Sequence, residues 1–521
     1  MNKAKFIWAL SYFVYLLVRL LSSDIPMLNI PIIRFTILIS CLFIYPSLVL
    51  ADEDAGRRLW HNVQRNLQDQ EKELVTDETV NENTDHLSIV LNGQTFSVEN
   101  NVNEVGQALY LSINHQQVKD VERFLLMYQK LPRHDMQLVH FAQANLARSQ
   151  GNLVAAEQHY QAILHQQPDF TRAKLELARV YYENQKNKEA GLLFNEISAA
   201  NHDNENKLPP AVIKNITSYQ DAIELRNAWR GSFAVGYIFN DNTNMSPNKP
   251  PVCKEYAENG SCIVERKLPL AKKANGISYD ATLRKIYQLS GHHGISLRSM
   301  TYGESYRHHS DENENTTSAY LGYNYKAQKN DFLIGPIIEF NHVGNHSRYR
   351  TTGMKTEWMN ILSKNLALNL EGEYKQFRYH KLYNHNDGNM TSVYATLSYY
   401  LTDQTITFTG GDWVNKTSVE KTDDYQQKGI RAGISTQLYP GINAVVFTAL
   451  RQRQFGDYSV PLSARRKDNE QLYSAILSMP KFDVFGLTPV ITYRYRKNNS
   501  NVDWLYSYNK NEVLIKFEKY F

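Results

Sequence analysis

The residues of this chain that could do chemistry are its histidines, its cysteines and a set of charged side chains on extended segments. His292-His293 and His308-His309 are adjacent pairs near the ends of such segments. Because adjacent residues on a strand point to opposite faces, neither pair can chelate a metal ion from one face. The chain has no phosphate-binding glycine-rich loop, no Cys-x-x-Cys and no His-Glu-x-x-His. We therefore expect no enzyme, no metal site and no cofactor.

Two of the three cysteines lie in one polar stretch, and Cys41 lies in the N-terminal leader. Cys253 and Cys262 are nine positions apart. In an exported protein, such a pair is typical of a disulfide. No histidine or further cysteine nearby completes a set of metal ligands, so we expect a Cys253–Cys262 disulfide.

Several charged residues fall on the polar face of alternating segments and are expected to line an interior. Two interpretations stay open for them. They form a structural ladder of ion pairs that fills the interior, or they form a polar path for a translocating chain. Arg465 and Arg466 precede a strand, and we expect them to fold into the mouth of the interior. The other residues of this set are Glu371, Glu373, Lys375, Arg451, Arg453, Arg494 and Arg496.

The elements that must position these residues are strands that alternate apolar and polar side chains from about residue 229 to the C-terminus. In one of them, Leu366, Leu368 and Leu370 lie on one face, and Glu371 and Glu373 lie on the other. Only a closed barrel can cross a membrane in this way, because hydrocarbon satisfies no backbone group. The 34 tyrosines suit the boundary between lipid and water.

The alternation predicts fourteen strands, an even number as expected for a bacterial barrel. Short turns alternate with longer segments at 240–275, 307–315, 345–352, 380–388 and 456–467. With an N-terminal domain in the periplasm, the long segments fall outside the cell. The predicted strands are 231–239, 276–289, 292–307, 316–328, 331–343, 353–364, 365–379, 389–401, 403–415, 425–438, 441–455, 468–481, 486–498 and 507–521.

The last strand ends on Phe521, with Phe517 on the same outward face. A terminal aromatic residue at the end of an alternating strand is typical of proteins that the bacterial barrel-assembly machinery inserts. We therefore expect Phe517 and Phe521 to act as a barrel-assembly signal.

A 34-residue helical repeat precedes the barrel. Small residues at fixed positions let two antiparallel helices pack closely, and an aromatic residue fills the seam to the next repeat. This pattern predicts tetratricopeptide (TPR) repeats with a concave surface for a partner, although a purely structural spacer is the alternative. The packing positions are Ala144, Ala156, Tyr160, Pro168, Leu177, Ala178, Tyr181, Ala190 and Phe194.

The N-terminus reads as a secretory signal, with Arg34 before the apolar run Phe35 to Leu50 and a cleavage site after Ala51. We expect the true start at Met27, and an extended signal is the alternative. A retained helical hairpin anchor is the alternative to a cleaved signal. The net charge of +4 is too mild for a nucleic-acid partner. The sequence thus predicts an α + β two-domain protein of the Gram-negative outer membrane. Its segments are a leader (1–51), a polar segment with a short hairpin (52–100), a periplasmic TPR-like helical domain (101–228) and a 14-stranded transmembrane antiparallel β-barrel (229–521).

From residue 88 to the end, the chain resembles the surface lipoprotein assembly modulator (Slam) family. The resemblance rests on a combination of segments in order, none of which is specific alone. Lys467 departs from the arginine of the family. The matching segments are Asn92-Gly93-Gln94-Thr95-Phe96, Gly106-Gln107-Ala108-Leu109-Tyr110, His134-Asp135, Leu138-Val139, Phe141-Ala142, Gly151, Leu175-Glu176-Leu177-Ala178-Arg179, Glu189-Ala190, Phe194, Phe239-Asn240-Asp241-Asn242-Thr243-Asn244 and Arg465-Arg466-Lys467-Asp468.

The resemblance implies a periplasmic TPR domain, a 14-stranded barrel and delivery of client proteins across the outer membrane. Clients of the family are surface lipoproteins or soluble haem-binding proteins, and they are commonly encoded nearby. The implied partners are this client, the barrel-assembly machinery, periplasmic chaperones and outer-membrane lipid. No catalytic residues carry over. A host-contact barrel that acts through its own outer loops, and a nutrient pore or enzyme, are the alternatives.

Overall fold

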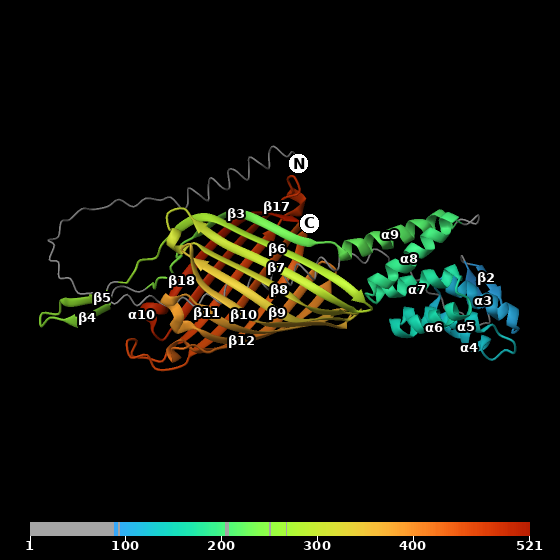
Figure 1. Ribbon diagram of the computed structural model, residues 1–521, viewed down its shortest axis with the longest axis horizontal. Coiled ribbons are helices and arrows are strands. Elements are labelled where there is room, and N and C mark those ends of the chain that lie inside the picture. Colours follow the sequence, from blue (N-terminus) through green and yellow to red (C-terminus); the bar gives the residue numbers. More distant parts are fainter. Residues whose placement is uncertain (1–87, 92–93, 204–207, 249–251, 267) are drawn as a thin grey trace. The chain divides into compact units, whose positions relative to one another are not determined.

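A computed structural model describes residues 88–91, 94–203, 208–248, 252–266 and 268–521. The expected leader and its start at Met27 lie outside these residues. The described chain begins with a helical domain and continues into a β-barrel (Figure 1). Among the described residues, no helix is both long enough and apolar enough to span a membrane.

An antiparallel hairpin of β1 (Ser88–Leu91) and β2 (Gln94–Ser97) precedes the helices. Seven helices of the described chain follow, and the first six form three pairs in chain order. They are α3 (Val102–Asn114), α4 (Val118–Tyr128), α5 (Met136–Ser149), α6 (Leu153–Gln166), α7 (Thr171–Glu183), α8 (Asn187–Asp203) and α9 (Pro210–Asn227).

Side-chain caps begin several of these helices. Asn101 Oδ1 accepts hydrogen bonds from the backbone N–H groups of Asn103 and Glu104, at 3.1 and 2.9 Å. Asp135 and Asn152 cap α5 and α6 in the same way. A cap satisfies an N–H group that has no partner inside its helix, so these residues set where each helix starts.

The barrel is a closed sheet of fourteen strands. Each strand pairs antiparallel with its neighbours in the chain, apart from an inserted hairpin of β4 (Val252–Tyr256) and β5 (Cys262–Arg266). The barrel strands are β3 (Arg230–Asn240), β6 (Ala274–Ser290), β7 (His293–Tyr306), β8 (Glu314–Lys326), β9 (Asn330–Val343), β10 (His346–Ser363), β11 (Leu366–Tyr379), β12 (Gly388–Thr402), β13 (Thr405–Lys416), β14 (Tyr425–Tyr439), β15 (Ile442–Phe455), β16 (Lys467–Ser478), β17 (Thr488–Ser500) and β18 (Tyr508–Tyr520).

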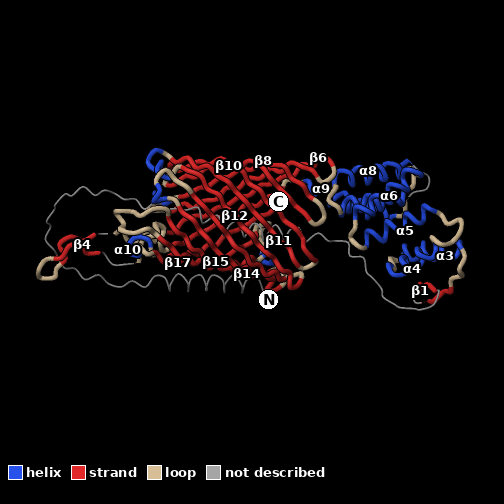
Figure 2. Tube along the Cα trace, turned by 90° about the horizontal axis from the view of Figure 1, so that it is seen from below, coloured by secondary structure: helices blue, strands red, loops and turns tan. Residues whose placement is uncertain are grey.

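Closure comes from β18, whose residues Glu512 to Tyr520 pair with Asn240 to Ser232 of β3. The strands run obliquely around the barrel (Figure 2). We call the end where β3 starts and β18 finishes the turn end, because tight turns join the strands there, apart from β16 and β17. We call the opposite end the loop end, where longer segments join the strands, apart from β9 and β10. The short helix α10 (Asp503–Tyr506) lies in one of these segments.

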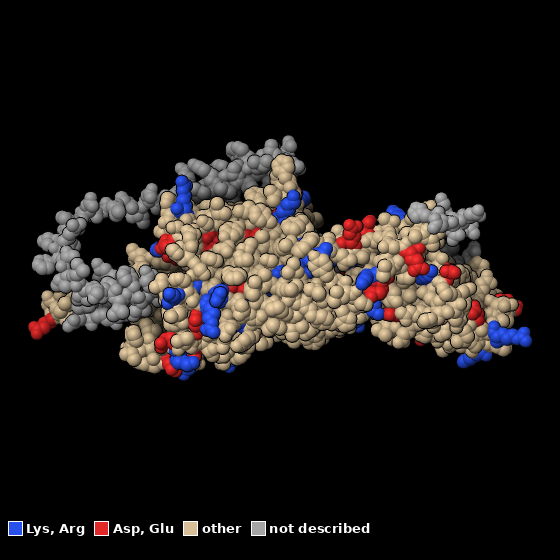
Figure 3. All heavy atoms as spheres, in the orientation of Figure 1, with Lys and Arg blue, Asp and Glu red and all other residues tan. Residues whose placement is uncertain are grey.

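Along the strands, side chains that are exposed on the outside alternate with side chains that are buried inside the barrel. The outward side chains are apolar where they must face lipid. Phe233, Val235 and Tyr237 of β3 are exposed on the outside, whereas Ala234 and Ile238 are buried. The visible barrel wall carries few charged side chains across its middle, and more charges lie toward the loop end (Figure 3). An uncharged exterior suits the hydrocarbon of a bilayer, which cannot solvate ions.

One predicted loop is wrong. Residues 345–352 were expected as a long outer segment, but β10 already begins at His346. Gly344 and Asn345 both have positive φ, of 58° and 65°, and so form the tight turn between β9 and β10. Two residues with φ > 0 are typical of a type I′ hairpin turn, whose twist matches that of the strands. The polar run after Asn345 had hidden this turn from the alternation pattern.

Candidate functional site

The expected packing positions lie in the core of the helical domain, apart from Tyr181, which is half-buried at its edge, and Pro168. Ala144, Ala156, Ala178 and Ala190 are fully buried, which lets the helices approach closely. The aromatic seam residues Tyr160 and Phe194 are also fully buried, and Leu177 is nearly so. Tyr160 meets Phe141 edge-on at 5.6 Å, and Phe194 stacks on Tyr219 at 5.1 Å between ring centroids. Pro168 is exposed in the turn between α6 and α7 instead.

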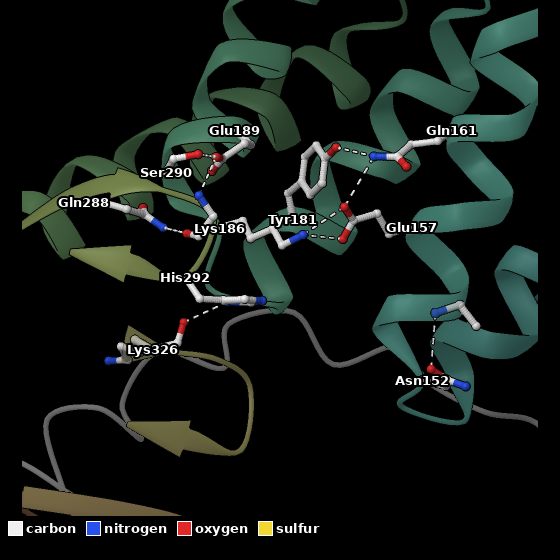
Figure 4. Close-up of polar contacts among 12 residues, drawn as sticks. Asn152, Glu157, Gln161, Tyr181, Lys186, Glu189, Gln288, Ser290, His292 and Lys326 are labelled. Atoms are coloured by element: carbon white, nitrogen blue, oxygen red, sulfur yellow. Dashed lines mark hydrogen bonds and ion pairs between the residues drawn. The ribbon is translucent and has the colours of Figure 1, made fainter. Parts of the chain in front are cut away.

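Polar bonds tie α6 to the pair that follows it. Tyr181 is half-buried, and its hydroxyl accepts a hydrogen bond of 3.0 Å from Gln161 Nε2 (Figure 4). Lys186 Nζ lies 2.6 Å from Glu157 Oε2, with both side chains largely buried. Neighbouring helix pairs are therefore joined by apolar contacts and by half-buried polar bonds. The apolar contacts form the core, which a single helix pair could not form by itself.

The turn between α7 and α8 also makes hydrogen bonds to the turn between β6 and β7. Gln288 Nε2 donates to the Gln185 carbonyl at 2.8 Å, and the backbone N–H of Lys188 donates to Gln288 Oε1 at 3.0 Å. Glu189 Oε1 accepts from the backbone N–H of Gly291 at 2.6 Å (Figure 4). These hydrogen bonds thus join the third helix pair to the β6–β7 turn of the barrel.

Two histidines face each other inside the helical domain. Nδ1 of His140 and Nδ1 of His159 lie 3.3 Å apart. Burial lowers the pKa of His159 below its ordinary value, and the neighbouring His140 lowers it further. Among the described residues, no group of three or more His, Cys, Asp or Glu side chains is arranged to hold a metal ion. The two rings share one hydrogen bond between their Nδ1 atoms, whose direction depends on the tautomers.

This pair predicts a pH dependence of stability. The pKa of His159 is lower in the folded protein than its value of 6.5 in the unfolded chain. As the pH falls below 6.5, the unfolded chain therefore binds more protons than the folded protein does. The contribution of neutral His159 to stability is therefore fully present above pH 6.5. It is lost as the pH falls from 6.5 toward the lower pKa of the folded protein. We expect the helical signal in circular dichroism to melt at a lower temperature at acidic pH, and His159→Asn to reduce the difference. His165→Asn, an exposed position on the same helix, should leave the pH dependence unchanged; an equal effect of both variants would contradict the assignment.

Charged residues line the barrel interior from mid-strand toward the loop end, and we call this set the ionic belt. Lys375 Nζ lies 2.9 Å from Glu339 Oε2 and 3.3 Å from Glu373 Oε2. The side chains of Lys375 and Glu373 are 2% and 1% exposed. Arg298 Nη1 lies 2.6 Å from Glu357, three strands away. The belt consists of Arg298, Glu339, Lys355, Glu357, Glu371, Glu373, Lys375, Asp412, Arg431, Arg451, Glu470, Arg494, Lys510 and Glu512.

The belt continues on the other side of the barrel. Arg451 lies 3.5 Å from Asp412 through Nε and 3.3 Å from Glu470 through Nη1. Arg494 lies 3.7 Å from Glu512, which also pairs with Lys510 at 3.0 Å. Apart from Arg494, which is 20% exposed, these side chains are at most 10% exposed, so ion pairs fill most of the interior at this level. Buried charges persist only when they have charged partners, as these do.

The remaining charges of the predicted set have different surroundings. Arg453 donates from Nε to Gln427 Oε1 at 3.0 Å, and Arg496 is buried. Arg465 is exposed and donates from Nε to the Phe455 carbonyl at 2.7 Å. Arg466 lies over the rings of Phe455 and Tyr506, at 4.3 and 3.4 Å, and pairs with Asp468 at 2.6 Å. The arginine pair thus holds loops together at the mouth.

Below the ionic belt, toward the turn end, part of the interior is apolar. A cluster of inward side chains on β13 to β17 is buried there. Barrel interiors are ordinarily polar, and alternation alone gave no sign of this cluster. Its members are Phe408, Val445, Phe447, Ala449, Leu472, Ile476 and Val490.

The segments at the loop end form one hydrogen-bonded ring, because each is joined to the next. Asn242 anchors the first of them: its Nδ2 donates to the carbonyls of Ser246 and Asn509, at 2.9 and 3.0 Å. The Cys253–Cys262 disulfide is formed in that same segment. One link of this ring, His380–Arg348, runs through the start of β10. Bonds that join successive segments directly are Lys272–Glu312, Gly344–Asn313, Val419–Asp387, Gly456–Asp424, Asn501–Arg465 and Asn248–Ser507.

At the turn end, the C-terminal residue completes the barrel. Phe521 and Gly231 exchange two backbone hydrogen bonds, of 2.8 and 3.1 Å. A Cβ atom at Gly231 would lie 2.8 Å from the Phe521 ring, so glycine leaves the space for this ring. Phe517 and Phe521 are both exposed, as outward residues are.

Comparison with known proteins matches both parts of the chain. A family model described as "Surface lipoprotein assembly modifier" matches residues 229–521, and one described as "Surface lipoprotein assembly modifier, N-terminal TPR repeats" matches residues 91–194. The "Hemophilin secretion modulator" of Acinetobacter baumannii is 37% identical over 492 residues, covering 93% of this chain and 98% of that protein. The "Surface lipoprotein assembly modifier" of Pasteurella multocida is 26% identical over 439 residues, covering 80% and 82%.

Proposed function

Because the chain belongs to the surface lipoprotein assembly modifier family, we propose that it delivers particular client proteins across the outer membrane to the cell surface. Family membership and a closed 14-stranded barrel place it in the outer membrane of a Gram-negative bacterium. The family is one of secretion and assembly factors, and we propose no catalytic role for this member.

The observation that carries the proposal is the joining of a helical repeat domain to a barrel in one chain. A nutrient pore or an adhesin does not need a periplasmic protein-binding domain. The relative that is 37% identical is named for the secretion of hemophilin, whereas the relatives named for lipoproteins are 22–26% identical. This difference supports a secreted, hemophilin-like client. The resemblance to the family implies that this client is encoded nearby.

We assign the two steps of delivery to the two domains. The helical domain captures the client before it folds, and the barrel conducts it outward. In the folded barrel the ionic belt fills the interior. A client can therefore pass there only if the ion pairs open and the polar groups of the client take the place of the lost partners. The sequence has no nucleotide site, so folding of the client outside the cell supplies the direction. The barrel-assembly machinery, periplasmic chaperones and outer-membrane lipid complete the set of expected partners.

This mechanism predicts that a client folded too early cannot be exported. A client that carries an engineered disulfide between two distant segments should fold in the periplasm and remain there bound to this protein. The same client with both cysteines replaced by serine is the control and should reach the medium or cell surface. Equally fast export of the cross-linked client would contradict folding outside as the source of direction.

A host-contact role is the second candidate, and the β4–β5 hairpin favours it. Tyr256 and Ile263 on this hairpin are 66% and 61% exposed, so they are available to a partner outside the cell. Exposed aromatic and aliphatic side chains on a disulfide-closed hairpin suit protein contact. Deletion of the hairpin separates the two candidates, because only the host-contact role depends on it.

A further inference from the structure

Arg172 occupies an unusual position on the helical domain, because it bridges three helices. It lies in the first turn of α7, and its Nη1 donates to the hydroxyl of Tyr110 on α3 at 2.7 Å. Its Nη2 donates to Asn114 Oδ1, also on α3. The guanidinium carbon lies 5.0 Å from the ring centroids of both Tyr110 and Phe141, and Phe141 is on α5.

This geometry identifies the surface that the first helices of the three pairs share. An α7 side chain that touches α3 must cross over α5, so α3, α5 and α7 meet on one face. In stacks of helix pairs, the first helices line the face that is left for a partner. Tyr110 is 44% exposed, so the edge of this arrangement is open to solvent.

All described partners of the Arg172 guanidinium are uncharged. Among the residues that the structure describes, no carboxylate forms an ion pair with it. Other arginines of the same domain are neutralised: Arg148 pairs with Glu183 and Glu176 at 2.5 and 3.3 Å, and Arg179 pairs with Glu176 at 2.8 Å. The first turn of α7 contains no acidic residue either.

The rings and the two α3 oxygens hold the guanidinium in place without neutralising it. A guanidinium has five N–H donors in a planar fork, and two of them are used here, so about three remain. Carboxylates are the groups that such a fork binds in a bidentate manner. A preformed, positively charged fork on the partner face therefore has the chemistry of a carboxylate receptor.

We propose that Arg172, oriented by Tyr110, Asn114 and Phe141, binds a carboxylate of the client while the client is extended. This inference rests on the proposed function and adds to it the chemistry by which the client is recognised. Either an acidic side chain or the C-terminal carboxylate of the client supplies the group. Arg172 acts by binding, and the three residues around it act by positioning.

The test uses the full-length protein in detergent micelles and fluorescent Gly/Ser peptides. One peptide carries several Glu residues and a second carries Gln in their place, each with a free or an amidated C-terminus. Fluorescence anisotropy measures their affinities. We expect the Glu peptide, or the Gln peptide with a free C-terminus, to bind wild type about tenfold more tightly than the amidated Gln peptide, the factor expected of a charge-assisted hydrogen-bonded pair. Which peptide binds distinguishes the two sources of carboxylate.

Arg172→Gln should abolish this preference, and Arg172→Lys should retain only part of it, because lysine keeps the charge and lacks the fork. The matched control is Lys214→Gln, which removes one exposed positive charge from α9. Circular dichroism shows whether each variant is folded. If Lys214→Gln weakens binding as much as Arg172→Gln, or if Arg172→Gln binds all peptides like wild type, the proposal is wrong.

Failure of this inference is distinguishable from failure of the proposed function. If Arg172→Gln leaves peptide binding unchanged while deletion of the helical domain still stops export, only the carboxylate site is wrong. If the location of the client does not depend on this protein at all, the proposed function is wrong, whatever the peptides show.

Discussion

Deletion of residues 102–227 will leave a folded barrel in the outer membrane and stop delivery of the client. The barrel persists because β3 to β18 pair only with one another and close without the helices. Delivery stops because the client then meets the barrel only by free diffusion. A tethered capture site raises the effective concentration of a bound chain to the millimolar range, and its loss weakens engagement by about 10²–10⁴-fold. Export is measured as the amount of client outside the cell, and barrel folding as its heat-sensitive migration in gels.

The matched control removes residues 252–266 instead, which deletes the β4–β5 hairpin at the loop end. Export should continue in this variant, because the hairpin pairs with no barrel strand. The host-contact alternative predicts the reverse pattern. Binding of the cells to host material would then survive the loss of the helices and disappear with the hairpin, whereas the location of the client would be unaffected by either deletion.

Replacement of Lys375 by methionine will lower the free energy of unfolding of the barrel by about 3–5 kcal/mol, the cost of breaking a buried ion pair by removing one partner. Methionine has a similar length and carries no charge, so Glu339 loses the cation that lies 2.9 Å away. Glu373 loses one of its two cations and keeps Lys355 at 3.2 Å. Unfolding in urea, followed by tryptophan fluorescence in lipid vesicles, measures the change.

Two further variants make this prediction specific. Lys381→Met removes an exposed lysine from the loop end and should leave the free energy of unfolding nearly unchanged. The double variant Lys375→Met with Glu339→Gln should recover part of the loss, because no buried carboxylate is then left without its cation. If Lys375→Met unfolds at the same urea concentration as wild type, the ionic belt does not stabilise the barrel, and its role as a polar path gains support.

The barrel was predictable from sequence because a strand facing lipid must alternate. Leu366, Leu368 and Leu370 face outward while Glu371 and Glu373 face inward, and the period of two needs no tertiary information. The tetratricopeptide positions were predictable for a related reason. Close helix packing requires alanine at Ala144 and Ala178, 34 residues apart, and both are fully buried.

Partners across the barrel were not predictable, because alternation gives the face of a residue and says nothing of which strand supplies its partner. Arg298 and Glu357 lie on β7 and β10, which are not neighbours, so their ion pair depends on the curvature of the closed sheet. Arg172 is a similar case. Its sequence position marks the start of a helix, and only the stacking of α3, α5 and α7 reveals that it bridges them.

The loop end was the least predictable part, because polar residues look alike whether they continue a strand or leave it. His346 to Thr352 form the start of β10 beyond the apolar stretch, so the pattern placed them in a loop. The ring of hydrogen bonds between neighbouring segments left no trace in sequence either. It joins backbone groups, such as the N–H of Gly456 and the carbonyl of Asp424, that every residue has.

The most direct test of the account is protease accessibility of the neighbouring gene's product on intact cells, with and without this protein. If this protein delivers the product, the product is cleaved at the surface, or found in the medium, only when this protein is present. Without it, the product should be intact and retained in the periplasm. If the product reaches the same location in both strains, the protein does not deliver this client, and the account of export is contradicted.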